Sequence, residues 1–271
     1  MKMKMNSLII LAFLCLVLVF HSSLIKAQEV EDEREFDYSL RSEKGPHRWG
    51  DLKVEWEACK NGEMQSPIDI MSHQRVELIR SFEHKYYKPA NATIKNRGHD
   101  ISIKWHGDVG SYFINGIEYP LKSAHWHSPS EHTINGRRYA MELHMVHQSP
   151  DQTLQNQIAV TSVLYRIGKP DAFLSRLMSN ISLLVDEEDE EIHTGWIDPT
   201  EINYTCTMYY RYFGSLTTPP CTEGVIWTIN TKIRTVSWRQ MKLLREAVHD
   251  YAEWNARPLQ PLNDRKIYVL I

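Results

Sequence analysis

Three histidines offer the clearest chemistry in this sequence. His125 and His127 flank a single residue, Trp126, and His144 follows seventeen residues later. Side chains at i and i+2 point to the same face of a β-strand, so His125 and His127 can face one point. A histidine on a neighbouring strand would complete a set of three imidazoles. Three histidines with an open fourth position are typical of a catalytic zinc site that activates water, because structural sites are closed by four protein ligands.

The segment around His144 also offers a carboxylate and a further histidine. Glu142 lies two residues before His144 and therefore on the same strand face. Zinc-bound histidines usually donate their second ring N–H to a carboxylate or carbonyl, and Glu142 can serve a histidine on its own or an adjacent strand. His147 has the opposite parity and is expected to face away. We therefore predict His144 as the ligand and His147 as a histidine of the core or of the other sheet face.

The elements that would position these residues are mainly strands. Clusters of Gly, Asn and Pro separate them, and Asn135-Gly136 is a strong hairpin signal. Strands that follow one another without regular intervening helices favour a mainly antiparallel sheet. The expected strands, between residues 92 and 163 or just beyond, are Ile101–Trp105, Tyr112–Ile114, His125–His127, Met141–His147 and Ile158–Tyr165.

Two helices are expected outside this region. Residues 171–184 have helical spacing of apolar residues, and residues 237–254 form the better pattern, with Ser237 as the cap. The acidic run 186–191 is expected to be a solvated loop. There are no internal repeats and no interdomain linker, so we predict a single α+β domain dominated by strands, with short peripheral helices.

The first 27 residues have the order of a secretory signal peptide: lysines, an apolar run, then small and polar residues ending at Ala27. A membrane anchor is the alternative, but the apolar run Leu8–Phe20 is about 13 residues, and a span needs ~20. No membrane span is expected in the mature chain. Residues 28–45 are charged and are expected to form a loosely ordered arm, followed by one catalytic domain over 46–271.

Charge argues against nucleic-acid binding. The formal net charge is −3, and removal of the three lysines within residues 1–27 makes it −6. A mildly acidic domain has no electrostatic reason to bind nucleic acid.

Cysteines and glycosylation sequons fit the secretory route. After removal of Cys15, Cys59, Cys206 and Cys221 remain, which allows three pairings with one free thiol. Three triplets are candidate N-glycosylation sites, at Asn91, Asn180 and Asn203.

Longer motifs around these residues resemble the α-class carbonic anhydrases, in their plant secretory branch. The resemblance covers about residues 46–268, nearly the whole mature chain. The motifs that carry it are Gln65-Ser-Pro-Ile-Asp69, Asn96-Arg-Gly-His99, His125-Trp-His127-Ser-Pro-Ser-Glu131-His-Thr, Glu142-Leu-His144-Met-Val-His147, Gly214-Ser-Leu-Thr217-Thr-Pro-Pro-Cys221 and Asn255-Ala-Arg257-Pro.

The resemblance implies reversible hydration of CO2 to bicarbonate and a proton. His125, His127 and His144 would hold Zn²⁺, and zinc hydroxide would attack CO2. Thr217 would act as gatekeeper, donating its hydroxyl proton to Glu131 and accepting from the hydroxide, with Thr218 beside it.

The resemblance also assigns the surroundings. An apolar wall for CO2 would come from Val146, Val160, Leu216 and Trp227. His99 would carry protons to bulk buffer, since a histidine pKa of ~6.5 suits transfer near neutral pH. Cys59 and Cys221 would form a disulfide beside the gatekeeper loop. Cys206 would be left over, either as a buried free thiol or in an intermolecular bond. The fold would be a twisted sheet of about ten strands, with zinc at the bottom of a cone.

Two positions depart from the family pattern. Ser123 stands where the family usually has a glutamine that orients the first histidine ligand, and Asp51 stands where many animal relatives carry a tyrosine at the cavity mouth. A serine is shorter than a glutamine and would need a bridging water to reach His125.

Two other functions compete with the secreted zinc enzyme. Some plant relatives look like storage or defence proteins on the same fold, and metal content would separate them from the enzyme. A zinc hydrolase of activated esters is the third hypothesis, and the ratio of ester hydrolysis to CO2 hydration would identify it. Secretory entry predicts an extracellular or apoplastic location, with a plastid reached through the secretory route as the alternative.

Overall fold

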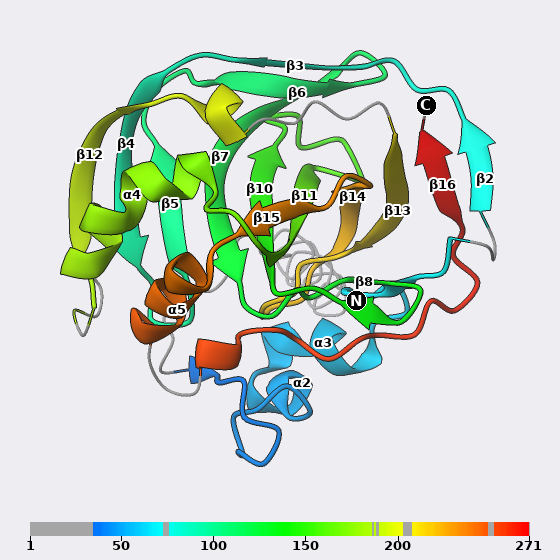
Figure 1. Ribbon diagram of the computed structural model, residues 1–271. Helices are drawn as coiled ribbons and strands as arrows, with labels where there is room; N and C mark the ends of the chain where they lie inside the picture. Colours follow the sequence, from blue (N-terminus) through cyan, green and yellow to red (C-terminus); the bar gives the residue numbers. More distant parts are fainter. Residues whose placement is uncertain are drawn as a thin grey trace, which may run out of the picture.

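The protein is built on one large mixed sheet. The computed structural model describes residues 35–72, 76–185, 187, 190–202, 208–248 and 252–270. Within these ranges the sheet has 13 strands, with short helices around it (Figure 1). Ten strands follow one path, in the order β12 (Glu191–Ile197), β4 (Ala90–Asn96), β5 (Ile101–Trp105), β7 (Ile117–His127), β10 (Met141–Gln148), β11 (Ile158–Ile167), β14 (Glu223–Asn230), β13 (Tyr209–Ser215), β16 (Ile267–Leu270) and β2 (Val76–Ile79).

Three strands branch from this path. β15 (Arg234–Val236) pairs with β11, and β6 (Gly110–Ile114) links the start of β7 to β3 (Glu83–Tyr87). A second small sheet contains β1 (Asp69–Ile70), β8 (Thr133–Ile134) and β9 (Arg137–Arg138). Pairing is antiparallel except for β11 with β14 and β15, β16 with β2, and β1 with β8. The predicted fold class, a strand-dominated α+β domain with a mostly antiparallel sheet, is confirmed.

The hairpin predicted at Asn135-Gly136 is present between β8 and β9. Both residues have positive φ, 51° for Asn135 and 73° for Gly136. A two-residue type I′ turn needs positive φ at both central positions, which Asn and Gly adopt at low cost.

Strand alternation separates the site from the main core. On β7, Ala124 and Trp126 point toward the helix-covered face, where Trp126 packs against Phe173 of α4, with ring centroids 6.5 Å apart. His125 and His127 therefore point to the opposite face. His147 lies on the face away from His144, as predicted: its Nδ1 donates to the Ala159 carbonyl and its Nε2 accepts from the Tyr87 hydroxyl.

The two predicted helices are present, but one is shorter than expected. α4 (Ala172–Leu183) is capped by Asp171, whose side chain accepts from the Leu174 N–H. α5 (Trp238–Glu246) begins with a capping box of Ser237 and Gln240. It ends at Glu246 and not at residue 254, and a 3₁₀ turn, Ala252–Trp254, follows. The helix does not continue to residue 254 because Asn255, the residue after this turn, donates its side-chain N–H to the Trp126 carbonyl of β7.

The smaller helical elements are α2 (Trp49–Leu52), α3 (Ala58–Asn61) and the 3₁₀ turns Val54–Trp56 and Pro199–Ile202. None of the helices in the described part of the chain is long and apolar enough to cross a bilayer.

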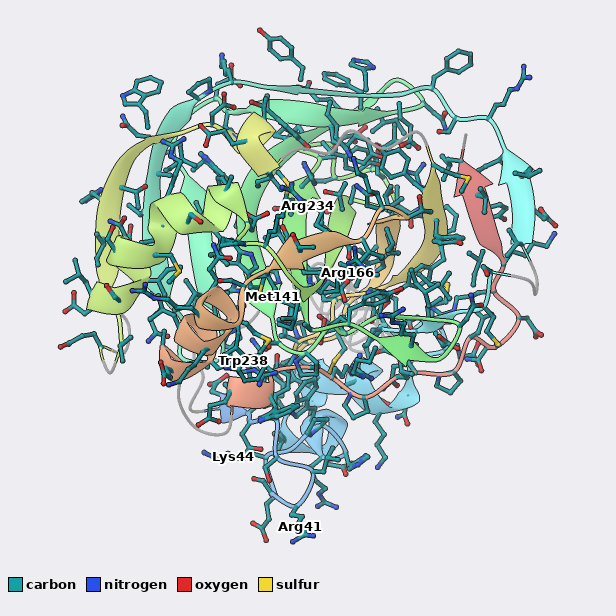
Figure 2. All side chains as sticks on the ribbon, viewed as in Figure 1. Arg41, Lys44, Met141, Arg166, Arg234 and Trp238 are labelled. Carbon is teal, nitrogen blue, oxygen red and sulfur yellow. A yellow bond between two sulfur atoms is a disulfide. The ribbon has the colours of Figure 1, made fainter. Side chains whose placement is uncertain are left out.

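A loosely ordered arm was expected over residues 28–45, and residues 35–45, the part of it that the structure describes, are anchored to the core at two aromatic positions. Phe36 and Tyr38 are buried, and the Trp49 indole donates to the carbonyls of Asp37 and Lys44. Apolar rings at two positions of a charged segment are enough to anchor it to the core. Only the tip of the segment, with the labelled Arg41 and Lys44, projects away from the sheet (Figure 2).

Candidate metal centre and active site

The three predicted ligands meet on one face of the sheet. In the β7–β10 pair, His144 lies opposite His125 and Glu142 lies opposite His127. The ring centroids of His125, His127 and His144 are 4.6 to 5.2 Å apart. One nitrogen from each ring lies within 4.8 Å of the others. Strand register therefore converts a sequence spacing into a compact cluster of three buried imidazoles.

The hydrogen bonds of the rings decide which nitrogens could bind a metal. His127 Nδ1 donates to the Asn255 carbonyl at 2.7 Å, which leaves Nε2 with a lone pair. That Nε2 is buried and has no hydrogen-bond partner among the described residues. His144 Nε2 donates to Glu142 Oε1 at 2.9 Å, which leaves Nδ1 as the nitrogen that could bind a metal ion. A buried nitrogen lone pair without a donor fits a metal ion, and three imidazoles suit zinc.

Burial keeps two of the imidazoles neutral, as metal binding requires. It lowers the pKa of His144 to about 4 and holds the pKa of His125 well below its ordinary value. For His127, burial also opposes the charged form, but the Glu131 carboxylate and the Asn255 carbonyl outweigh it and raise the pKa. A proton therefore competes with a metal ion mainly at His127.

Glu142 is the centre of a buried hydrogen-bond network. Its Oε2 accepts the backbone N–H groups of Glu131 and His132, each at 2.8 Å. Its Oε1 accepts from His144 Nε2, from His132 Nδ1 at 2.7 Å and from Ser162 Oγ at 2.5 Å. Burial alone would raise the pKa of Glu142, but His132 and His144 outweigh it and hold the pKa well below its ordinary value. The carboxylate is ionised and fixes both the ring and the tautomer of His144.

His132, Glu142 and His144 form a second group with metal-like geometry. Both nitrogens of His132 are occupied, because Nδ1 bonds to Glu142 and Nε2 lies 2.7 Å from the Tyr212 hydroxyl. The nitrogen of His144 in this group is the one that donates to Glu142. This group is therefore a supporting hydrogen-bond network, and the cluster of His125, His127 and His144 is the one that could hold a metal ion.

Glu131 lies beside the cluster and is fixed by the C-terminal segment. Its Oε1 accepts the backbone N–H of Arg257 at 2.9 Å. Its Oε2 lies 3.6 Å from His127 Nε2 and accepts no hydrogen bond within the described ranges. The hydrogen bond from Thr217 to Glu131 that the resemblance implies is thus not among the described contacts. Thr217 and Thr218 are both buried, and Thr218 Oγ1 has no described partner.

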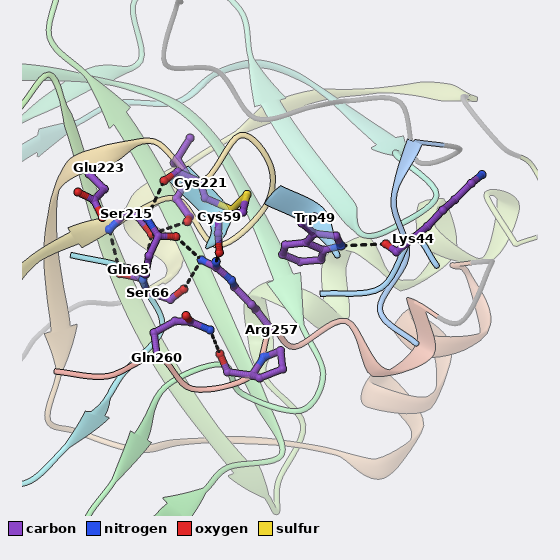
Figure 3. Close-up of a disulfide and its surroundings, with 12 residues drawn as sticks. Lys44, Trp49, Cys59, Gln65, Ser66, Ser215, Cys221, Glu223, Arg257 and Gln260 are labelled. Carbon is purple, nitrogen blue, oxygen red and sulfur yellow. Dashed lines mark hydrogen bonds between the residues drawn. A yellow bond between two sulfur atoms is a disulfide. The ribbon is translucent and has the colours of Figure 1, made fainter. Parts of the chain in front are cut away.

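The expected disulfide joins Cys59 of α3 to Cys221, with Cα atoms 5.0 Å apart (Figure 3). Gln65 donates to the Cys221 carbonyl at 3.1 Å, and the Arg257 guanidinium donates to the Cys59 carbonyl at 2.9 Å. Arg257 also donates to Gln65 Oε1 at 2.8 Å. Arg257 therefore links the disulfide to Glu131.

The four residues predicted to form an apolar wall lie together beside His144. Val146 lies opposite Val160, and Val160 lies opposite Trp227 on the next strand. Leu216, Val160 and Trp227 belong to one apolar cluster, against which Val146 packs. The Trp227 and His144 ring centroids are 4.8 Å apart. An apolar surface therefore borders the metal cluster on one side.

The structure places His99 in the interior and Ser123 on the strand face of the histidine cluster. The His99 carbonyl accepts from Asn255 Nδ2 at 2.8 Å, and its ring centroid is 5.1 Å from that of Phe36. His99 Nε2 lies 3.6 Å from Asp100 Oδ2. Ser123 is partly buried, opposite Val146, on the face that carries His125.

Of the sequons, Asn91 lies on β4 and is exposed, and Asn180 lies on α4 and is partly buried. Asn203 and Cys206 lie outside the described residues.

Known proteins resemble the chain over most of its length. The family profile of eukaryotic-type carbonic anhydrase matches residues 44–271. Carbonic anhydrase Nec1 of Nesocodon mauritianus is 56% identical over 256 residues, which cover 94% of this chain and 92% of that protein. Alpha carbonic anhydrase 7 of Arabidopsis thaliana is 53% identical over 243 residues, which cover 89% and 86%. The chain belongs to the eukaryotic-type, or α-class, carbonic anhydrase family.

A solved structure supports the same relation. The crystal structure of dioscorin complexed with ascorbate aligns with a TM-score of 0.82 at 43% identity, over 87% of this chain and 97% of that one. The chain is therefore a carbonic anhydrase in fold and in sequence, and family membership implies hydration of CO2. The family uses zinc, and the three-histidine cluster is the place where this enzyme could hold it. The plant relatives and the disulfide indicate the secretory pathway.

Several supporting residues were not assigned a role from sequence. His132, Ser162 and Tyr212 complete the Glu142 network, and Asn255 and Arg257 hold His127 and Glu131. His132, Asn255 and Arg257 lie within motifs that carry the family resemblance, but no role was predicted for them. Ser162 and Tyr212 lie in ordinary strand patterns and carry no local signal.

Proposed function

We propose that this enzyme hydrates CO2 reversibly with Zn²⁺ held by His125, His127 and His144. The observation that carries the proposal is the set of tautomers: hydrogen bonds to Asn255 and Glu142 turn one lone pair of His127 and one of His144 toward the same point. Bound zinc would supply Lewis acidity, which lowers the pKa of a coordinated water. The protein's own residues supply the orientation, the apolar wall and the path for the proton.

Glu131 and Thr217 are proposed to orient the attacking oxygen. An ionised carboxylate can only accept hydrogen bonds, so a hydroxyl that donates to it can accept only from its other neighbour. The free Oε2 of Glu131 beside His127 leaves room for that donor. Thr217 would then hold a lone pair of the oxygen toward CO2, which is a gain in orientation. Val146, Val160, Leu216 and Trp227 would hold the apolar substrate, with Thr218 next to it.

His99 is proposed to carry the released proton to buffer. Imidazole is the side-chain group suited to accept and release protons near neutral pH. Its contact with Asn255, which also holds His127, keeps it close to the metal cluster. Imidazole added to a weakly buffered solution can replace such a group.

The proposed location is outside the cell, in the apoplast or cell wall, after removal of residues 1–27. The plastid reached through the secretory route is the alternative, and N-terminal sequencing with fractionation separates the two. The sequons at Asn91, Asn180 and Asn203 belong to the same proposal.

The test is stopped-flow CO2 hydration on the purified mature protein, with zinc measured on the same sample. We expect one zinc per chain and fast hydration that His127→Ala abolishes. A folded protein that neither holds zinc nor hydrates CO2 after zinc is added back would refute the proposal. The storage hypothesis would then lead. One zinc without hydration would direct attention to Ser123.

A further inference from the structure

Trp196 is an exposed aromatic residue on an edge strand. It lies on β12, which pairs only with β4 among the described strands, and its side chain is 66% exposed. Edge strands with exposed apolar side chains favour edge-to-edge association, so proteins usually cover or charge them. The Trp196 indole therefore offers a large apolar ring at this edge of the sheet.

A β-bulge directs the Trp196 side chain to this surface. The register shifts between His193 and Gly195, so that Gly195 lies opposite Ala92 and Trp196 lies opposite Asn91. If the pairing continued from His193 without the register shift, Trp196 would lie opposite Ala90, whose side chain belongs to the buried core. Bulges commonly redirect a side chain in this way. The bulge therefore moves the indole from the core-facing position to the outer position beside Asn91.

Asn91 is the first residue of the sequon Asn91-Ala92-Thr93, and its side chain is exposed. Residues directly opposite on antiparallel strands have Cβ atoms about 4.5–5.5 Å apart and share one face. Anything attached to the Asn91 amide thus begins beside the Trp196 ring. The Thr93 hydroxyl is buried and lies 3.0 Å from His106 Nε2, so attachment would have to precede folding.

We infer that Asn91 carries an N-linked glycan and that its first sugar packs on the face of Trp196. The Asn91 amide nitrogen would displace the lipid diphosphate from C1 of the N-acetylglucosamine of a lipid-linked oligosaccharide. A C–N bond forms, the C1–O bond breaks, and the amide loses one proton. The ring C–H groups of the sugar then offer an apolar face to an indole, whose ring is apolar and whose N–H can stay hydrated. The inference rests on the secretory route and not on catalysis.

The test begins with occupancy. The full chain is produced in a yeast secretory host, trimmed with an endoglycosidase that leaves one N-acetylglucosamine, and mapped by peptide mass spectrometry. We expect the Asn91 peptide to carry the sugar and N91Q to remove it. N180Q is the matched control and must leave the Asn91 sugar in place. An unmodified Asn91 in the secreted protein overturns the inference.

The second step measures coupling between the sugar and the ring. W196A is compared in the trimmed glycoprotein and in N91Q by thermal unfolding. Loss of one aromatic contact in a domain of this size is expected to lower the Tm by about 2–4 °C. That shift should appear with the sugar present and nearly vanish in N91Q.

A control variant shows whether the effect is local. W238A removes another exposed tryptophan, at the start of α5 and on a different element. Its Tm shift should be the same with and without the Asn91 sugar. An equal W196A shift in both backgrounds, or a sugar-dependent W238A shift, would overturn the packing of the sugar on Trp196.

Discussion

Replacement of Glu142 by glutamine tests how the metal centre is held. The carboxylate accepts from the backbone N–H groups of Glu131 and His132 on one oxygen and from His132, His144 and Ser162 on the other. An ionised carboxylate only accepts, whereas a glutamine amide replaces one oxygen by an NH2 donor. In either orientation of the amide, its NH2 group faces N–H or O–H groups that can no longer find an acceptor there. We expect glutamine to turn its oxygen toward one set and to leave the other set unpaired.

The magnitude follows from the bond to His144. A hydrogen bond to a charged group contributes about 1.5–3 kcal/mol, and loss of a ligand's supporting partner weakens metal binding about 10–100-fold. Tenfold corresponds to about 1.4 kcal/mol, so the two ranges agree. We expect Glu142→Gln to raise the zinc dissociation constant about 10–100-fold. Hydration should fall at limiting zinc and partly recover when zinc is in excess.

The assay is a competition titration against a chromophoric zinc chelator, with CO2 hydration followed on the same samples. Glu118→Gln is the matched control, since Glu118 is an exposed carboxylate on the same sheet that accepts from Ser111 Oγ at 2.7 Å. Cooperative unfolding of zinc-free Glu142→Gln must first show that the variant is folded. A folded variant with a zinc dissociation constant within about twofold of the wild type would refute the reasoning.

Three further predictions concern proton transfer, pH and the disulfide. His99→Ala should slow turnover in weak buffer in stopped-flow assays, and imidazole should restore part of it; unchanged turnover would exclude His99. Burial lowers the pKa of His147 to about 3, against ~6.5 when unfolded, so its contribution is present above pH 6.5 and is lost as pH falls toward 3. When the pH falls from 7 to 5, the unfolding free energy of the zinc-free protein, measured in urea, should therefore decrease by about 2 kcal/mol more in the wild type than in His147→Gln. Equal decreases in the two proteins would contradict this. The double variant Cys59→Ser, Cys221→Ser should have an unfolding free energy lower than that of the oxidised wild type by up to about 5 kcal/mol. If the disulfide is responsible, the variant should be as stable as the reduced wild type.

Local patterns were enough to predict the ligand cluster in outline. The period of two along a strand places His125 and His127 together and turns His147 away from His144. Asp171, Ser237 and the Asn135-Gly136 turn act through neighbouring residues, so their effects are visible in sequence. The register that sets His144 opposite His125 is a long-range property, and only the resemblance to the family supplied it.

The features that sequence reasoning did not provide depend on contacts between distant segments. Asn255 fixes the tautomer of His127 from 128 residues away, and Arg257 binds Glu131 from 126 residues away. Phe36 packs on His99 from within a segment whose charge predicted loose order. The early end of α5 has the same origin, because Asn255 must leave the helical path to reach the sheet. A local sequence pattern does not identify a contact partner that is distant in the chain.

The contacts of Arg257 connect the chemistry to the compartment. Its backbone N–H fixes Glu131, and its guanidinium donates to Gln65, Ser66 and Cys59. Burial lowers its pKa to about 10, so it stays charged near neutral pH. Cys59 is covalently joined to Cys221, which directly follows the loop of Thr217 and Thr218. Disulfides persist in oxidising compartments. A chain kept reduced would lack the cross-link between this loop and Cys59, whose carbonyl binds Arg257. The parts proposed to orient the attacking oxygen thus depend on a bond that the secretory route provides.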